Sequence, residues 1–219
     1  METQLITRIE KKSTYSRRYQ IYVNDELQFS VHEDVLVKHR LYKGMPIDPQ
    51  QIQEILSSEE YGKVRQATLR YLSYKPRTIW EVKQYLAGKD FATEYTEQVI
   101  QDFQDQGYLD DRQYARSWVE ERRAHKGHGQ IRLRQEMLKK GIAEKWIDEA
   151  LSYTDNDEER QQAMKIAERR YLRIYQDSWP KVERRLGQYL LRQGYSAEIV
   201  YPILTIFRSR HEQEKRGDF

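Results

Sequence analysis

Apolar residues recur at helical spacing through most of this chain, most clearly between residues 103 and 142. Four of them share one face of a predicted helix that begins near residue 111: Tyr114, Ala115, Trp118 and Val119. Asp110 is suited to cap this helix, because its side-chain oxygen can accept hydrogen bonds from the free N–H groups of the first turn, and Gln113 follows three residues later, as in a capping box. Gly107 predicts the end of the preceding helix, and Gly141 the end of a following one. The pattern predicts packed helices that each bury one stripe.

Residues 1–47 show a different pattern. Three short runs, 5–12, 17–24 and 27–31, have the composition of strands. Asn24-Asp25-Glu26 predicts a turn between two of these strands, residues 35–41 predict a short helix, and residues 43–46 predict a turn into a last strand. We therefore expect a small antiparallel sheet, an N-terminal β-rich extension whose default role is docking or capping.

Helices are predicted from residue 48 onward. Asp48 and Pro49 have the residue types of an N-cap and a first helical position, and we expect this helix to break near residues 57–58. Thr78 and Glu81 predict a second capping box. A third helix is expected to begin at Thr93 or Thr96 and to run through residue 103.

Internal repetition sets the domain organisation. Residues 138–151 align with residues 191–204 without a gap, so Gly141 falls on Gly194 with an offset of 53 residues, and Phe91 falls on Ile142 with an offset of 51. We predict a mainly α fold in which three tandem three-helix units form an elongated curved rod. The expected domains are an N-terminal β-rich extension over 1–47, a first unit over 48–110, a second over 111–157, and a third with a frayed charged tail over 158–219.

Composition agrees with thin helical modules. Hydrophobic residues make up 38% of the chain and the mean hydropathy is −0.98, which argues against a single thick core. The chain has no cysteine, which excludes disulfides, a thiolate nucleophile and a cysteine-based zinc site. The first residues lack an apolar signal core and no run approaches membrane-spanning length, so we expect a cytoplasmic protein.

Charge is distributed unevenly along the chain. Residues 54–111 hold 7 basic and 11 acidic side chains, whereas residues 112–151 hold 10 and 6, and residues 158–216 hold 13 and 8. This asymmetry is typical of a protein whose basic part contacts nucleic acid or an anionic protein groove. The candidate contact residues are Arg122, Arg123, Lys126, Arg132, Lys139, Lys140, Arg169, Arg170, Arg173, Arg184 and Arg185. For each of them taken singly, a solvated helix face is the more common role.

Catalytic and metal-binding interpretations have weaker support. Helix capping accounts for Asp110 and Asp111, and neighbouring residues at a helix start do not converge on one substrate atom. His125 and His128 lack a third ligand nearby, so a solvated loop is favoured over a metal site. The Gly127–Gly129 segment lacks the spacing of a phosphate-binding loop and is favoured as a tight connection between two helices. We expect no enzymatic activity, no cofactor and no metal.

The central stretch also carries a resemblance. GYLDDRQYARSWVEERR at 107–123, KGHGQIR at 126–132 and EMLKKGI at 136–142 resemble the central signature of the RecX family, regulators of the RecA recombinase. ATLRYLSYKPRTIWEVKQYL at 67–86 is similar to the family's first repeat. The resemblance covers roughly residues 60–210, leaves the N-terminal sheet outside, and does not match the third unit clearly. The family-motif positions are Gly107, Tyr108, Asp110, Asp111, Tyr114, Ala115, Arg122, Lys126, Gly127, Gly129 and Gly141.

The resemblance implies a regulatory protein of DNA recombination, DNA repair and the SOS response. RecX-like proteins bind the RecA–single-stranded DNA filament, lie in its helical groove, and inhibit strand exchange and ATP hydrolysis. The implied partners are the filament and single-stranded DNA, with double-stranded DNA as a further candidate, and we expect a monomer. Most motif positions are expected to shape the scaffold, with Arg122, Lys126 and Lys140 as the better contact candidates. The alternative is a helix-turn-helix type protein that binds DNA directly.

Overall fold

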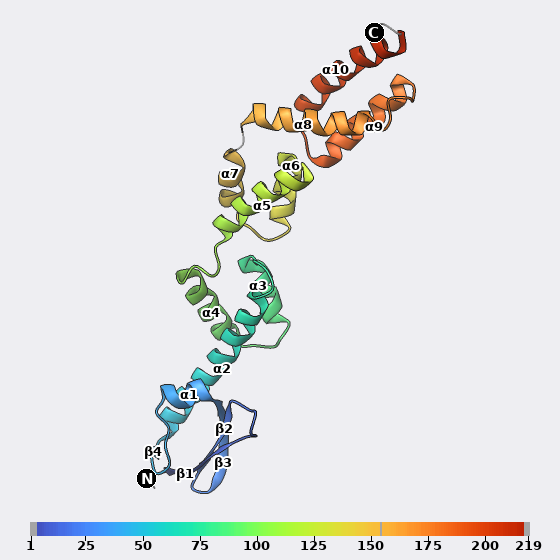
Figure 1. The fold of residues 1–219 in the computed structure, drawn as a ribbon. Coiled ribbons are helices and arrows are strands. Elements are labelled where there is room, and N and C mark those ends of the chain that lie inside the picture. The colour runs from blue at the N-terminus through green and yellow to red at the C-terminus, as the bar shows by residue number, and fades with distance from the viewer. Residues whose placement is uncertain (1–3, 154, 217–219) are drawn as a thin grey trace. The chain divides into compact units, whose positions relative to one another are not determined.

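The computed structural model of the chain describes residues 4–153 and 155–216 (Figure 1). Contacts group these residues into two compact regions: an N-terminal region that contains the described residues up to 76 together with 82–108, and a C-terminal region that contains 77–81 together with those from 109 onward. Ten helices and four strands lie in the described part of the chain, and none of these helices is long and apolar enough to cross a membrane. The predicted mainly α fold with an N-terminal sheet is confirmed.

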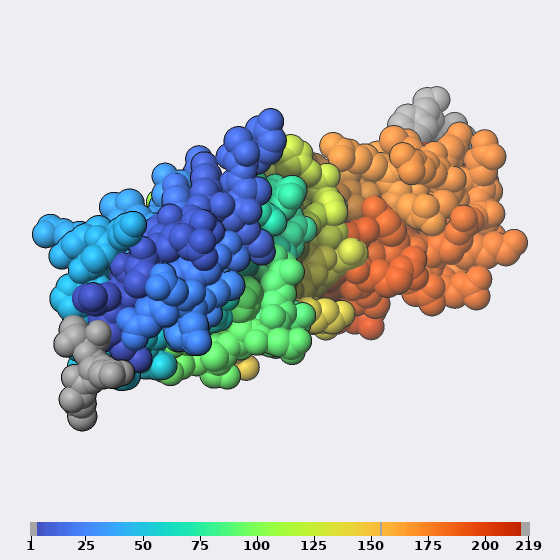
Figure 2. Space-filling model, turned by 90° about the horizontal axis from the view of Figure 1, so that it is seen from below, coloured from blue at the N-terminus to red at the C-terminus, as the bar shows by residue number. Residues whose placement is uncertain are grey.

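The N-terminal sheet is antiparallel and has the order β3-β2-β1-β4. Its strands are β1 Gln4–Lys11, β2 Arg18–Val23, β3 Glu26–His32 and β4 Pro46–Ile47. The predicted turn between β2 and β3 is present, and its two central residues, Asn24 and Asp25, have φ angles of 49° and 67°. Both lie in the left-handed region that two-residue hairpin turns favour. Ile6, Ile21 and Val31 are buried in the core of this sheet, whose outer surface is blue in Figure 2.

Two helices cover this core. The short helix α1 spans Glu33–Lys38, and α2 spans Pro49–Leu72. Asp48 and Gln51 form the capping box at the start of α2, which confirms the predicted N-cap. The predicted break near residues 57–58 is wrong, because the next turn of α2 is held against the sheet: the buried Glu59 accepts a hydrogen bond from the His32 N–H at 2.7 Å and pairs with Arg18 at 2.7 Å.

The first three-helix unit continues from α2 into α3, Ile79–Ala87, and α4, Thr93–Asp105. The capping box at the start of α3 is confirmed: the N–H of Thr78 donates to Glu81 at 3.0 Å, and the N–H of Glu81 donates to the Thr78 hydroxyl at 3.2 Å. Side chains from α2, α3 and α4 are buried along this unit: Val64, Leu86, Val99 and Phe103.

The second and third three-helix units make up most of the C-terminal region. Their helices are α5 Asp111–Lys126, α6 Gln130–Leu138, α7 Glu144–Ser152, α8 Asn156–Tyr171, α9 Trp179–Gln193 and α10 Ala197–Arg216. Each unit buries its own apolar cluster, around Leu133 and Ile147 in the second and around Leu186 and Phe207 in the third. This agrees with the prediction of thin modules.

The prediction of a frayed charged tail over residues 208–219 is wrong up to residue 216, and residues 217–219 lie outside the described part. Helix α10 continues to Arg216 because its last turns still pack on α8. His211 is buried and lies 3.1 Å from the hydroxyl of Tyr171, and Arg210 pairs with Glu168 at 2.8 Å. One buried side chain, His211, and the Arg210–Glu168 ion pair therefore hold this charged segment against α8.

Candidate functional site

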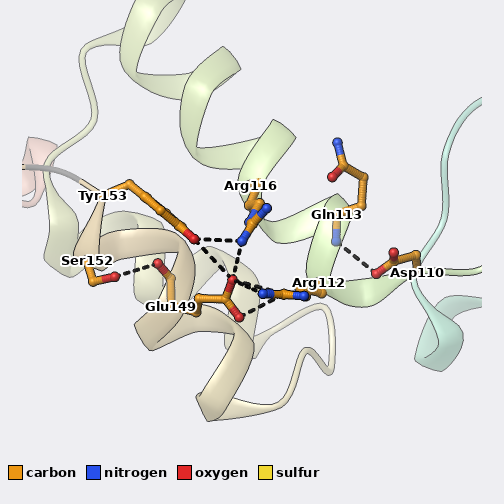
Figure 3. Close-up of polar contacts among 7 residues, drawn as sticks. All are labelled: Asp110, Arg112, Gln113, Arg116, Glu149, Ser152 and Tyr153. Atoms are coloured by element: carbon orange, nitrogen blue, oxygen red, sulfur yellow. Dashed lines mark hydrogen bonds and ion pairs between the residues drawn. The ribbon is translucent and has the colours of Figure 1, made fainter.

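The second three-helix unit begins as the sequence predicts. The carboxylate of Asp110 accepts a hydrogen bond from the N–H of Gln113 at 2.9 Å and so caps α5 (Figure 3). Before it, Gly107 has a φ of 75°, and the N–H of Tyr108 donates to the carbonyl of Phe103 at 2.8 Å, which closes α4. Tyr108 itself is exposed, whereas Ala115 is buried in the core of the unit.

Asp111 caps a different helix. Its carboxylate accepts a hydrogen bond at 2.9 Å from the N–H of Ile79, the first residue of α3. Burial raises the pKa of Asp111 above its usual value, although this hydrogen bond favours the charged form. Asp110 and Asp111 thus serve two separate helix starts and do not converge on a common point.

The start of α3 packs on the turn that ends α6. The Thr78 hydroxyl donates to the carbonyl of Lys140 at 2.8 Å, and the Lys140 ammonium lies 2.8 Å from the carboxylate of Glu81. Gly141 has a φ of 71°, and a Cβ at this position would lie 2.4 Å from the Trp80 side chain. We call these contacts the first junction, formed by Thr78, Ile79, Trp80, Glu81, Asp111, Lys140 and Gly141.

An equivalent arrangement joins α6 to the turn that ends α9. Glu159 of α8 is buried and accepts a hydrogen bond at 2.8 Å from the N–H of Gln130, the first residue of α6. The N–H of Gly129 donates to the Gln193 carbonyl at 2.8 Å, and a Cβ on Gly129 would lie 2.5 Å from the Gly194 carbonyl oxygen. We call these contacts the second junction, formed by Gly127, Gly129, Gln130, Ile131, Arg132, Glu159, Gln193, Gly194 and Tyr195.

Three of the four glycines of the family motif, Gly127, Gly129 and Gly141, lie at these junctions, whereas Gly107 closes α4. Gly127 ends α5 with a φ of 61°, a Cβ there would lie 1.9 Å from Ile166, and its carbonyl accepts a hydrogen bond at 3.0 Å from the hydroxyl of Tyr195. The segment 127–129 connects α5 to α6 within the second unit, as its sequence predicts. It also contacts the third unit, and this contact requires glycine because the two backbones nearly touch.

A charged cluster on α5 and α7 was not among the predicted site residues. Arg112 donates to both carboxylate oxygens of Glu149 at 2.9 and 2.8 Å, and Arg116 pairs with the same carboxylate (Figure 3). Arg116 also donates to the hydroxyl of Tyr153 at 2.7 Å. The hydrogen bonds from Arg112 and Arg116 lower the pKa of Glu149 to about 2. This cluster holds α5 against α7, and the sequence offers only the four-residue spacing of the two arginines as a signal.

The Trp118 ring contacts two of the predicted contact cations. The guanidinium of Arg122 lies 4.0 Å from the centre of the Trp118 ring, and the ammonium of Lys140 lies 4.8 Å from the same ring. The indole N–H of Trp118 donates to Glu136 at 3.2 Å. Burial opposes the charge of Lys140, but its contacts with Glu81 and Tyr114 outweigh burial and raise its pKa. Arg122 and Lys140 therefore stabilise the interior of the second unit.

The other candidate cations fall into two groups. Some have partners within the chain: Arg123 with Glu158, Arg132 with Glu136, Arg170 with the ring of Tyr189, and Arg185 with Asp177. The remaining five are exposed and have no ion pair or ring contact in the described part of the chain: Lys126, Lys139, Arg169, Arg173 and Arg184. These five are the candidate residues that a partner can reach without displacing an existing contact.

The two histidines of the second unit lie in different surroundings. His125 is exposed, but His128 is buried, so the prediction of a solvated loop is wrong for His128. Its Nδ1 lies 3.2 Å from the carboxylate of Glu136, and burial lowers its pKa. Within residues 4–153 and 155–216, no group of three or more His, Cys, Asp or Glu side chains is placed to hold a metal ion.

A groove of 670 Å³ lies along α5, α7 and α8. Its charged and polar lining includes Arg116, Arg123, Tyr153, Glu158 and Lys165, while Val119 and Ala150 supply apolar surface. Both signs of charge are present, and Arg116 and Arg123 are already paired with Glu149 and Glu158. Lys165 and Glu120 balance the remaining charge of the lining, so the groove offers no net excess of unpaired cations to a phosphate backbone.

Comparison with family models matches four segments in chain order. The RecX N-terminal domain matches residues 4–48, the first three-helix domain 65–103, the second 110–151 and the third 157–204. Two expectations from the sequence are thereby corrected. The N-terminal sheet lies inside the family's matched region, and the third unit is matched by a family domain of its own. The strand pattern and the third helical pattern hold too few motif residues to show this by inspection.

Relatives and solved structures agree with the family models. The regulatory protein RecX of Halalkalibacterium halodurans is 33% identical over 218 residues, which cover 98% of this chain and 82% of the relative. The RecX protein of Clostridium tetani is 29% identical over 91% of this chain and 93% of its own length. A crystal structure of regulatory protein RecX superposes with a TM-score of 0.74 at 30% identity, covering 92% of this chain and 98% of that one. That of RecX from Lactobacillus salivarius gives 0.63 at 27% identity, covering 68% and 96%. The chain belongs to the RecX family of regulatory proteins.

Proposed function

We propose that this protein binds the RecA–single-stranded DNA filament and inhibits its ATPase and recombinase activities. The observation that carries the proposal is the match to all four RecX domains in order, together with relatives named regulatory protein RecX along almost the whole chain. It acts in the cytoplasm as a monomer, by binding and without catalysis of its own.

Exposed cations supply an electrostatic basis for this function. Lys126 lies at the end of α5, Lys139 follows α6, and Arg169, Arg173 and Arg184 lie on the third unit. Cations without partners attract an anionic filament and neutralise phosphates, which gives affinity that depends on salt. We assign partner contact to these five residues and place Arg122 and Lys140, which are held by Trp118 and Glu81, among the residues that shape the surface.

Repetition along the chain also suits a filament. Successive three-helix units can contact successive subunits of a repeating partner, and linked contacts strengthen one another through effective concentration. Each single contact can then be weak while the whole protein binds tightly.

The test is RecA ATPase on preformed single-stranded DNA filaments, with this protein added well below one copy per recombinase. Inhibition at that ratio is expected, because a protein bound along the filament or at its end affects many protomers. The direct DNA-binding alternative predicts inhibition only at concentrations that coat the DNA. An absence of inhibition, together with tight binding to naked DNA, would replace the proposal by that alternative.

A further inference from the structure

A second, smaller groove lies beside α6 at the end of α9. Its volume is 370 Å³, and it is lined by Ile131 and Leu191 together with Arg132, Glu136, Lys139 and Arg192. Ile131 and Leu191 are 48% and 50% exposed, which is high for aliphatic side chains that adjoin a packed helix junction. We call this the junction groove. It combines apolar surface with a cationic rim.

The rim has uncompensated positive charge. Arg132 pairs with Glu136 at 3.1 Å, and Glu136 also accepts the indole N–H of Trp118, so the carboxylate of the groove is already engaged. Lys139 and Arg192 are exposed, and no carboxylate of the described residues pairs with either of them. A ligand that brings carboxylates to this rim therefore gains two ion pairs without breaking an existing one.

The groove is held rigidly by the second junction. The N–H of Ile131 donates to the carbonyl of Gly194 at 3.1 Å, and a Cβ on Gly194 would lie 2.4 Å from Arg132. The two walls therefore meet backbone to backbone. A preformed groove binds with a smaller loss of conformational entropy than a groove that must be ordered on binding.

A related pattern occurs at the first junction. Trp80 and Ile131 are each the second residue of their helix, and Leu138-Lys139 aligns with Leu191-Arg192 in the repeat. Trp80 and Leu138 are 45% and 44% exposed. An exposed apolar pair followed by a cation is therefore present twice. The first junction differs in two ways, because Trp80 is aromatic and its cation, Lys139, also lines the junction groove.

We propose, on the basis of the proposed function, that the junction groove docks an acidic segment with aliphatic side chains on a protomer of the recombinase filament. The aliphatic side chains of the segment cover Ile131 and Leu191, and its carboxylates pair with Lys139 and Arg192.

A protein segment fits this groove better than a nucleic-acid strand. Single-stranded nucleic acid gains most of its base affinity by stacking on aromatic rings, and the junction groove presents aliphatic side chains in their place. Phosphates alone would satisfy Lys139 and Arg192 but leave Ile131 and Leu191 exposed to water. An apolar centre with a charged rim is the usual composition of a protein–protein contact.

Photo-crosslinking tests the occupant directly. Leu191 is replaced by p-benzoylphenylalanine, and Val37, which is 66% exposed on α1 and has no assigned partner contact, is replaced in the same way as a control. Each protein is irradiated on RecA–single-stranded DNA filaments, and the crosslinked peptides are sequenced. The proposal predicts that position 191 gives an acidic, aliphatic-containing RecA peptide at least fivefold above position 37. Crosslinks from 191 to DNA, or none above the control, would overturn it.

Charge reversal tests the rim. The double variant Lys139→Glu/Arg192→Glu is expected to raise the concentration that half-inhibits the RecA ATPase at least tenfold, whereas Lys43→Glu/Arg160→Glu, with the same change in net charge on other exposed cations, changes it less than twofold. Circular dichroism confirms that both fold. If the wild-type protein does not inhibit, the proposed function fails. If it inhibits and the double variant inhibits equally well, the function stands and the assignment of the junction groove fails.

Discussion

The two junctions of the C-terminal region have the same helix cap but are held together by different contacts. In both, a carboxylate from the first helix of the following three-helix unit caps the second helix of the unit before it: Asp111 caps Ile79, and Glu159 caps Gln130. At the first junction, side chains complete the contact through Thr78 and the Glu81–Lys140 pair. At the second, Gly129 lets the backbones bond directly.

This difference determines how each junction can be broken. A junction built from side chains loses one contact at a time and can relax around a truncation. A junction built from two backbones has no flexible atom that can move aside, so an added methyl group must separate the units. The sequence shows both as the same glycine turn, and only the surroundings of each glycine distinguish them.

The largest expected effect is at Gly129. A Cβ there would meet the Gly194 carbonyl oxygen at 2.5 Å, so Gly129→Ala should lower the free energy of unfolding by about 3 kcal/mol. All four tryptophans lie in the C-terminal region, so urea denaturation followed by tryptophan fluorescence reports on this region. Gly187→Ala is the control, because its Cβ would meet only the Leu204 side chain, at 3.2 Å, and alanine favours the helix. Its free energy of unfolding should change by less than about 1 kcal/mol. Equal effects of the two variants would contradict the backbone contact.

Substitution of the two capping carboxylates should have the next largest effect on stability. Glu159→Ala should lower the free energy of unfolding by about 2 kcal/mol and Asp111→Ala by about 1 kcal/mol, because each substitution leaves a helical N–H without its acceptor. The effect of Glu159→Ala is the larger because Glu159 is the more buried of the two. The same urea titration measures both. Glu158→Ala is the matched control, since Glu158 is exposed and lies 3.8 Å from Arg123, and its loss should cost less than about 0.5 kcal/mol. A cost for Glu158→Ala as large as that for Glu159→Ala would argue against the cap.

The side-chain contacts of the two junctions should differ in their coupling free energies, and this effect is smaller. A double-mutant cycle of Glu81→Gln and Lys140→Met should give a coupling free energy of about 1 kcal/mol, because this ion pair is mostly shielded from solvent. The corresponding cycle of Arg132→Met and Gln193→Ala should give less than about 0.3 kcal/mol, since those groups are 3.5 Å apart and the backbone already joins the units. Equal coupling free energies would remove the distinction between the junctions.

The smallest expected effect is a pH dependence at His128, beside the second junction. Burial lowers its pKa below the usual 6.5, so the unfolded chain takes up this proton first as the pH falls. The free energy of unfolding of the C-terminal region should therefore decrease as the pH falls from 7 through 6.5 and below, and His128→Gln should flatten this dependence. Stability that rises on acidification, or an unchanged slope in the variant, would show that His128 is not held in its neutral form.

Features set by neighbouring residues were predictable from the sequence. The caps at Asp48, Thr78 and Asp110 depend on spacings of three residues, and the alignment of Gly141 with Gly194 revealed the three-helix units. Contacts between distant residues were not predictable. Lys140 was expected at the surface, but its partner Glu81 lies 59 residues away. Nothing in the sequence near His128 indicates that it is buried between two glycines that contact the third unit.

The Ser57–Ser58 break and the frayed tail failed for a related reason. Local propensity favours interruption at both places, but contacts with other elements decide the outcome. Glu59 binds the sheet one residue after the serines, and His211 packs on Tyr171 inside the expected tail. The candidate contact residues were unpredictable in the same way, because the sequence does not tell which cations already have a partner within the chain.

Binding to the filament compared with binding to naked DNA tests the central claim most directly. Fluorescence anisotropy of the labelled protein is measured against RecA–single-stranded DNA filaments and against the same DNA alone, over a series of salt concentrations. We predict tighter binding to the filament, with a smaller dependence on salt, because protein contacts add to phosphate neutralisation. Equal or weaker binding to the filament, with the steep salt dependence of a phosphate-driven contact on both, would contradict the account and leave a direct DNA-binding protein.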